Sequence, residues 1–138
     1  MQWYERDKKR LKIEITAVKD RYPQFELIKL RDGRLAWRGW LRTRRAADTY
    51  GRRYGVLVVY PSNYPVDAPR VYVEGISGIE STPHMFSDGS LCLFYPNDPR
   101  QWNPQQSTAV VAISWTAAWL HAYEVWKRTG RWPGRSLD

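Results

Sequence analysis

The first twenty or so residues have the apolar spacing of an amphipathic helix. The apolar positions of this stretch recur at intervals of seven, four, three and four residues: Tyr4, Leu11, Ile15, Val18 and Tyr22. This spacing places them on one helix face, with Lys, Arg and Glu on the other sides. Pro23 follows directly and cannot continue a helix. We therefore predict one helix over residues 3–22.

The next fifty residues contain four stretches typical of β-strands. Residues 24–30 and 34–42 flank an Asp-Gly pair, which is a hairpin signal between two β-prone runs. A polar and basic connection follows, and then residues 56–60 (VLVVY) form a continuous apolar run that predicts a central strand. Residues 70–74 (RVYVE) give the fourth strand. The expected order is a helix followed by a four-stranded antiparallel meander.

From residue 61 to residue 104 the chain is rich in proline. Seven of the nine prolines fall here, and each lacks the amide donor that regular structure needs. The same stretch holds the one cysteine, Cys92, and one of the two histidines, His84. Because a long irregular segment inside a compact domain is usually functional, we expect the active part of the molecule here.

The C-terminal part predicts a second major helix. Ser107 can cap its start, and residues 109–113 and 115–128 have helical character with a break near Ser114. One apolar stripe recurs at four, three and four residues and is expected to face the core: Trp115, Trp119, Ala122 and Trp126. Lys127 and Arg128 suit the last turn, Gly130 suits the position after it, and Trp132 is expected to fold back onto the domain. The fold class is therefore α+β, with residues 1–138 forming a single domain.

Composition restricts the function classes. One cysteine excludes an intramolecular disulfide framework and a multi-cysteine zinc site, and we expect no metal and no cofactor. No apolar run approaches the roughly 20 residues that span a membrane, and the N-terminus lacks the apolar segment of a signal peptide. We therefore expect a cytoplasmic protein.

The positive charge is concentrated in the N-terminal part. The formal net charge is +8, and residues 1–53 hold 16 of the 22 Lys and Arg, including the run Lys8, Lys9 and Arg10. Such a face can bind nucleic acid, an acidic partner protein, or nothing beyond solvent. No recognisable nucleic-acid motif accompanies the charge, so nucleic acid remains only a third alternative and we assign this run to protein partner binding.

Three ordered motifs resemble those of ubiquitin-conjugating enzymes. YPVDAPRV at residues 64–71 is similar to the YPxxPPxV turn between the third and fourth strands of that family. GSLCL at residues 89–93 is similar to its G-x-hydrophobic-C-L segment, whose cysteine carries the thioester. WNP at residues 102–104 resembles its W-x-P. The order of elements agrees as well, so the resemblance implies a UBC-like fold with Cys92 as the catalytic nucleophile.

Two features of the sequence differ from the pattern of the eukaryotic ubiquitin-conjugating enzymes. The family's His-Pro-Asn lies ten residues before the cysteine, whereas His84 precedes Cys92 by eight and is followed by Met85-Phe86, so the Asn is missing. The chain also lacks the last two helices of the eukaryotic members. PHxxxDGSLCL and the tail YEVWKRTGRWPG look like the bacterial branch found in CBASS antiphage operons, in its stand-alone form. That resemblance implies a partner with a C-terminal glycine, the operon's cyclic-oligonucleotide synthase, and a lysine-bearing acceptor protein.

The residue types near Cys92 suggest supporting roles. A thioester is activated toward aminolysis, so a cysteine can both accept and pass on an acyl group. In an extended backbone Leu91 and Leu93 would point opposite to Cys92 and anchor its flanks, while Gly89 leaves the sulfur accessible.

Several further residues are candidates for orienting the segment or the acceptor. The resemblance implies that His84 orients the loop by hydrogen bonding, and the alternative is a surface or loop-packing histidine. Trp102 is expected to pack beneath the loop. Asn97 or Asn103, or a backbone amide near Asp88, can replace the missing Asn. Asp88 or Asp98 can deprotonate an acceptor lysine, or simply cap turns. His121 is expected either on a helix surface or packed against neighbouring residues.

The leading hypothesis is an enzyme that uses Cys92. Its rival is a noncatalytic protein-binding module of the same fold, in which Cys92 is a buried structural residue. The loss of the His-Pro-Asn pattern favours the rival, and the retained cysteine within GSLCL opposes it.

Overall fold

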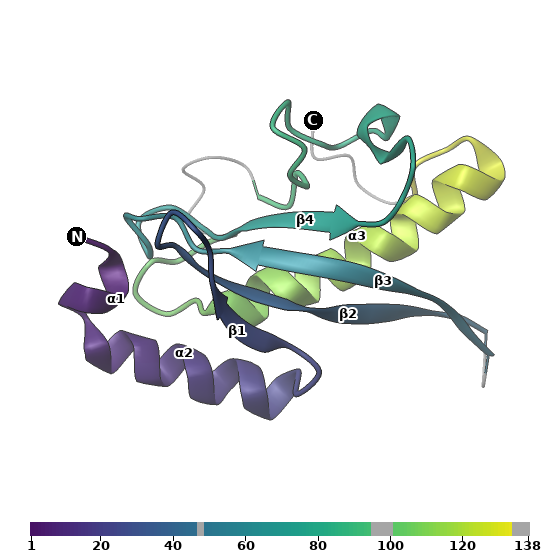
Figure 1. Cartoon of the computed structure of the whole chain (residues 1–138). Helices are drawn as coiled ribbons and strands as arrows, with labels where there is room; N and C mark the ends of the chain where they lie inside the picture. Colours follow the sequence, from purple (N-terminus) through teal and green to yellow (C-terminus); the bar gives the residue numbers. More distant parts are fainter. Residues whose placement is uncertain (47–48, 95–100, 134–138) are drawn as a thin grey trace.

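The computed structural model describes residues 1–46, 49–94 and 101–133, and Figure 1 shows their arrangement. The elements in chain order are α1 (Trp3–Arg6), α2 (Lys8–Arg21), β1 (Glu26–Lys29), β2 (Leu35–Ala46), β3 (Thr49–Val59), β4 (Arg70–Glu74), the short 3₁₀ helix η1 (Ile79–Ser81) and α3 (Ala109–Thr129). This order confirms the predicted helix, antiparallel meander and C-terminal helix. Within the described part of the chain, no further helix follows α3.

The four strands form one antiparallel sheet in the order β1-β2-β3-β4. Both long helices, α2 and α3, lie on the same side of this sheet (Figure 1). Large side chains buried between the sheet and the helices form the core, among them Phe25, Trp37, Tyr60 and Ile113. The opposite face of the sheet carries charged side chains, and an ion pair there joins Arg38 to Glu74.

Strands β2 and β3 are longer than the sequence predicts. Their pairing continues past Leu41↔Tyr54 to Ala46↔Thr49, with register shifts on either side of Arg44. The expected polar connection is therefore a two-stranded ribbon that extends beyond β1 and β4 (Figure 1). The residues of this part of the chain are mostly polar and basic, so they do not show the hydrophobic pattern by which strands are recognised.

The single helix predicted over residues 3–22 is divided into two helices, α1 and α2. Asp7 ends α1 and begins α2, where its side chain accepts a hydrogen bond from the backbone N–H of Arg10. An Asp at this position is a favourable N-cap, because its carboxylate satisfies an N–H that has no partner inside the helix. The apolar stripe spans both helices, and for that reason its spacing alone does not show the interruption.

Helix α3 is continuous, so the predicted break near Ser114 is wrong. Its N-cap is Thr108, whose hydroxyl accepts from the N–H of Val110, and not Ser107. At its C-terminal end Gly130 adopts a left-handed φ of 78°, as the sequence predicts.

The aromatic stripe on α3 is only partly buried. Trp119 and Ala122 lie in the core and Trp126 packs against it, but Trp115 is 39% exposed. The expectation that all four stripe residues face the core is therefore wrong at Trp115, which lies where the helix surface turns toward solvent.

Candidate active site

Cys92 lies at the end of a small hairpin within the proline-rich stretch of residues 61–104. Met85 and Leu91 form an isolated antiparallel bridge, and the turn between them is closed by hydrogen bonds from the N–H of Phe86 to Ser90 O and from that of Gly89 to Phe86 O. The N–H of Leu91 donates to Val71 O of β4 at 2.8 Å. The hairpin is thereby fastened to the edge of the sheet.

Burial alternates along this segment as the sequence predicts. Leu91 and Leu93 are each 3% exposed, while Cys92 between them forms no disulfide and is of intermediate exposure. Because neighbouring side chains of an extended chain point to opposite sides, the leucines anchor the backbone and leave the thiol at the surface. This placement disagrees with a fully buried structural cysteine.

The backbone carbonyl of His84 holds the cysteine segment in place. It accepts one hydrogen bond from the N–H of Cys92, at 2.9 Å, and another from Trp119 Nε1 on α3, at 3.1 Å. His84 has a positive φ of 61°, and its ring lies 4.8 Å from that of Trp132. Trp132 also packs edge-on against Trp119, which confirms that it folds back. His84 thus contributes to the position of the segment through its carbonyl.

Asp88 fixes the turn before the cysteine. One carboxylate oxygen accepts from the N–H and the hydroxyl of Ser90, and the other accepts from Arg70 Nη1 at 3.2 Å. The Ser90 hydroxyl and N–H, with Arg70, lower the pKa of Asp88. A carboxylate with a lowered pKa is a weak base, so this geometry favours the turn-capping role over proton abstraction.

Gly89 is required for its backbone conformation. Its φ is 89°, a backbone conformation that residues other than glycine rarely adopt. No atom lies within 4 Å of where a Cβ would stand, so a side chain would have room here. The backbone conformation, and not a shortage of space, is what requires glycine.

Trp102 packs beneath the cysteine segment as expected. It is 7% exposed, its Nε1 donates to Pro65 O at 2.9 Å, and its ring lies 5.8 Å from that of Phe94, two residues after Cys92. Asn103 lies close by in sequence, but its side chain accepts from the N–H of Gln105 within a local turn.

Two candidates to replace the missing Asn or to act as a base, Asn97 and Asp98, lie outside the described residues. His121 is exposed on α3, which is the first of its two expected placements.

A buried polar cluster, which the sequence pattern did not indicate, joins α2 to the connection between Cys92 and α3. Glu14 is fully buried; its Oε1 accepts from Tyr60 Oη and from the N–H of Ala109, and its Oε2 from Tyr64 Oη and Arg10 Nε. The sequence signal for its burial was its position, because Glu14 follows Leu11 by three residues and precedes Val18 by four, which places it on the apolar face of the helix.

Arg10 therefore does not belong to the exposed basic run. Besides Glu14 it donates to Pro104 O at 3.0 Å and to Ser107 O, both in the connection between the cysteine segment and α3. Lys8 and Lys9 are exposed on α2. Of the three residues assigned to partner binding, only these two lysines present their charge to solvent.

The described residues of the site offer one nucleophile, the thiol of Cys92. Among the described residues, no group of three or more His, Cys, Asp or Glu has the arrangement of a metal site. The same residues include no helix long and apolar enough to cross a membrane. The arrangement suits acyl transfer, in which an exposed thiol accepts and releases an acyl group.

Known proteins of similar structure share this fold. The yeast Vps23 UEV domain in complex with a Vps27 PSDP peptide is 16% identical, with a TM-score of 0.57, covering 96% of this chain and 86% of that one. The Vps23 UEV in complex with ubiquitin is 19% identical, with a TM-score of 0.55 and 83% of each chain covered.

Sequence comparisons identify the family. Ubiquitin-conjugating enzyme 15 of Arabidopsis thaliana is 36% identical over 61 residues, which cover 44% of this chain and 35% of the length of that protein. Residues 14–137 match the family described as type II CBASS E2 protein. With this match over most of its length, the helix–meander–helix fold and a cysteine where the ubiquitin-conjugating motif has one, the chain belongs to the type II CBASS E2 proteins.

Proposed function

We propose that this protein is a cysteine-dependent acyl transferase of the ubiquitin-conjugating type. Cys92 receives the C-terminal glycine of a partner protein as a thioester and passes it to a lysine amine. The observation that carries the proposal is the partly exposed thiol of Cys92 between two buried leucines, on a backbone held by the His84 carbonyl.

The proposed reaction has two steps, transfer of the acyl group to Cys92 and then to the acceptor amine. The sulfur attacks the carbonyl carbon of an activated acyl donor, an adenylate or a thioester supplied by another protein. The C–S bond forms, the bond to the leaving group breaks, and the thiol proton passes to solvent. The acceptor amine then attacks the same carbon, so a C–N bond forms, the C–S bond breaks and the amine proton is lost. Trp102 and His84 keep the segment fixed during both steps.

The partner we propose is the cyclic-oligonucleotide synthase of the same operon. Membership in the CBASS family supports a protein partner, and the UEV neighbours were solved with a peptide and with ubiquitin. We place the reaction in the bacterial cytoplasm, where thiols stay reduced.

Intact mass spectrometry of Cys92→Ser, purified after co-expression with its genomic neighbours, tests the proposal. Serine would form an oxyester, which turns over more slowly than a thioester. We expect a discrete mass increase equal to a partner minus water, mapping to residue 92. Cys92→Ala is the matched control and should carry no adduct. A folded Cys92→Ser protein that binds a neighbour but carries no adduct would contradict the proposal.

That negative result would favour the second candidate, a noncatalytic protein-binding module. Two observations support this candidate: the two structures of similar fold described above are UEV domains that bind a peptide and ubiquitin, and the family's Asn is absent after His84. The exposure of Cys92 and its fixed backbone support the enzyme instead.

A further inference from the structure

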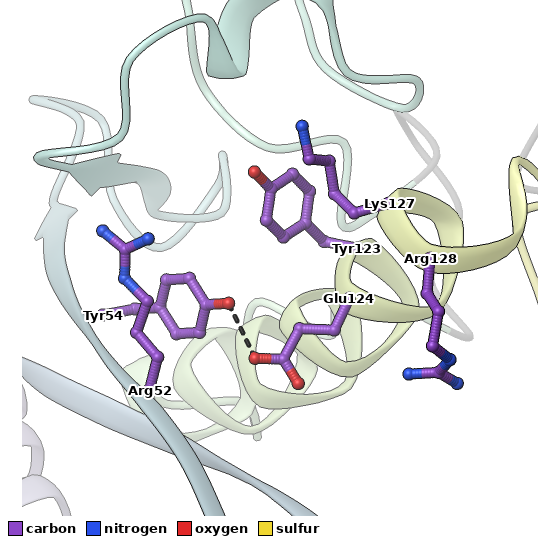
Figure 2. A pocket seen from close by; sticks show the side chains of 6 residues that line it. All are labelled: Arg52, Tyr54, Tyr123, Glu124, Lys127 and Arg128. Carbon is purple, nitrogen blue, oxygen red and sulfur yellow. Dashed lines mark hydrogen bonds between the residues drawn. The ribbon is translucent and has the colours of Figure 1, made fainter.

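An open hollow lies between β3 and the C-terminal end of α3, away from the residues discussed so far. Its volume is about 530 Å³. Figure 2 shows the side chains that line it: Arg52, Tyr54, Tyr123, Glu124, Lys127 and Arg128. Nothing in the proposed acyl transfer uses these residues.

The one acidic residue of the hollow is tied down by hydrogen bonds. Glu124 Oε2 accepts from Tyr54 Oη at 2.7 Å, the dashed line in Figure 2, and its Oε1 accepts from Thr43 Oγ1 at 2.8 Å. A Cβ at Gly51 would overlap Thr43 Oγ1 and stand 3.3 Å from Glu124 Oε2, so only glycine leaves room for this arrangement. Two hydroxyls and a glycine therefore fix the carboxylate.

The cations reach the hollow from two different elements. Arg52 comes from β3, where its guanidinium lies 5.5 Å from the centre of the Tyr54 ring. Lys127 and Arg128 come from the last turns of α3, and their side chains point away from each other, so the three cations lie apart along the hollow (Figure 2). All three side chains are exposed. The helix dipole accounts for basic residues at the end of α3, but it does not account for a third cation placed opposite them on a strand. The lining thus carries three positive charges against one negative charge.

The chemistry of this lining favours carboxylates on a peptide over phosphates of a nucleic acid. Arg and Lys side chains bind phosphates as well as carboxylates, so the aromatic residues of the lining decide between the two, because single-stranded nucleic acid also stacks its bases on aromatic rings. Tyr123 is stacked on Trp119, with ring centroids 5.6 Å apart and planes at 7°, and the Tyr54 hydroxyl is bonded to Glu124, so both rings are already engaged. Separate cations on two walls suit carboxylates spaced along a chain.

We propose that this hollow binds an acidic, extended peptide segment of the protein partner, with its carboxylates paired to Arg52, Lys127 and Arg128. The site is distinct from Cys92, and it does not require that Cys92 form a thioester. Since charge carries the recognition, the affinity should fall as salt is added.

NMR titration of the ¹⁵N-labelled full chain tests the proposal. The probe is a synthetic eight-residue peptide of alternating Glu and Gly, and its counterpart has Gln in place of Glu. We expect amide shifts centred on Arg52, Tyr123 and Lys127 with the acidic peptide and none with the Gln peptide. The double substitution Lys127→Gln with Arg128→Gln should weaken binding roughly tenfold, as expected for the loss of about 1.4 kcal/mol.

A matched variant with the same charge change separates this site from general basicity. Arg6→Gln with Lys12→Gln removes two exposed cations from α1 and α2, at the other end of the molecule (Figure 1), and should leave the affinity within about twofold of the parent. Equal weakening by both double substitutions would overturn the proposal, as would shifts confined to α2. A ten-nucleotide oligo-dT that shifts the hollow's amides where the peptide does not would also overturn it, in favour of nucleic acid. The mass measurement on Cys92→Ser is unaffected by any of these outcomes.

Discussion

The buried carboxylate of Glu14 organises more of the molecule than any other single side chain. It accepts hydrogen bonds from two tyrosines, from Arg10 and from the first N–H of α3, so it joins α2, the turn after β3 and the start of α3. Burial and the charge of Glu14 raise the pKa of Tyr60 and of Tyr64. Both tyrosines therefore stay protonated donors at neutral pH and above, and they keep the carboxylate satisfied.

Removal of Glu14 should be strongly destabilising. Glu14→Ala leaves the Arg10 guanidinium, only 12% exposed, without its counter-ion, and breaking a buried pair in this way typically costs about 3–5 kcal/mol. Urea unfolding followed by tryptophan fluorescence measures the change. Asp20→Ala, an exposed acid on the same helix, is the control and should stay within about 0.5 kcal/mol of the parent.

A joint replacement distinguishes the unpaired charge from lost packing. Arg10→Met combined with Glu14→Leu should be more stable than Glu14→Ala alone, because it removes the uncompensated charge and retains side-chain volume. A double variant as unstable as Glu14→Ala would instead assign the loss to the broken tyrosine and backbone hydrogen bonds.

Among the elements, α3 contacts the segment that contains Cys92 and also forms one side of the hollow. Its Trp119 donates to the carbonyl that holds Cys92, and one turn later Tyr123 lines the hollow. The start of α3 is fixed by Thr108 and by Glu14, which accepts from the N–H of Ala109. The position of this one helix therefore determines the geometry of two surfaces.

The cap of α3 gives an element-scale prediction. Thr108→Ala removes the oxygen that accepts from the N–H of Val110 and should lower stability by about 1 kcal/mol, whereas Thr108→Ser should change it little. Thermal unfolding by circular dichroism measures the difference. Equal melting temperatures for the alanine variant and the parent would show that Glu14 alone suffices to start the helix.

At the scale of the whole molecule, charge is distributed unevenly. The N-terminal part holds most of the basic residues, but the structure divides them by role. Arg10 is turned inward to Glu14, and Arg53 lies 3.9 Å from the centre of the Trp40 ring on the sheet. Lys8 and Lys9 are exposed on α2 and remain the part of this run available to a protein partner.

Reversal of these two charges should weaken docking of the partner. Lys8→Glu with Lys9→Glu is expected to lower the affinity for the protein identified by the Cys92→Ser adduct, mainly by slowing association, and less so at high salt. Surface plasmon resonance at two salt concentrations gives the rates. Lys8→Arg with Lys9→Arg keeps the charge and should bind as the parent does. Unchanged binding after reversal would remove α2 from the interface.

The order of elements was predictable because it rests on local patterns. The stripe from Leu11 to Tyr22, the Asp32-Gly33 turn and the run VLVVY each reflect a periodicity that neighbouring residues share. The alternation around Cys92 was predictable for the same reason, since opposite faces of an extended chain follow from its geometry. The sequence by itself thus determined the helix–meander–helix order and the exposure pattern of the GSLCL segment.

Contacts between distant residues were decided only by the tertiary structure. Glu14 and Ala109, 95 positions apart, meet because α2 and α3 pack on the same face of the sheet, and Arg10 joins them instead of facing solvent with Lys8 and Lys9. Arg52 and Lys127 face one hollow because β3 and α3 run side by side there. No local periodicity encodes such pairings, because the free energy that selects them comes from burial and hydrogen bonding between elements that only the folded chain brings together.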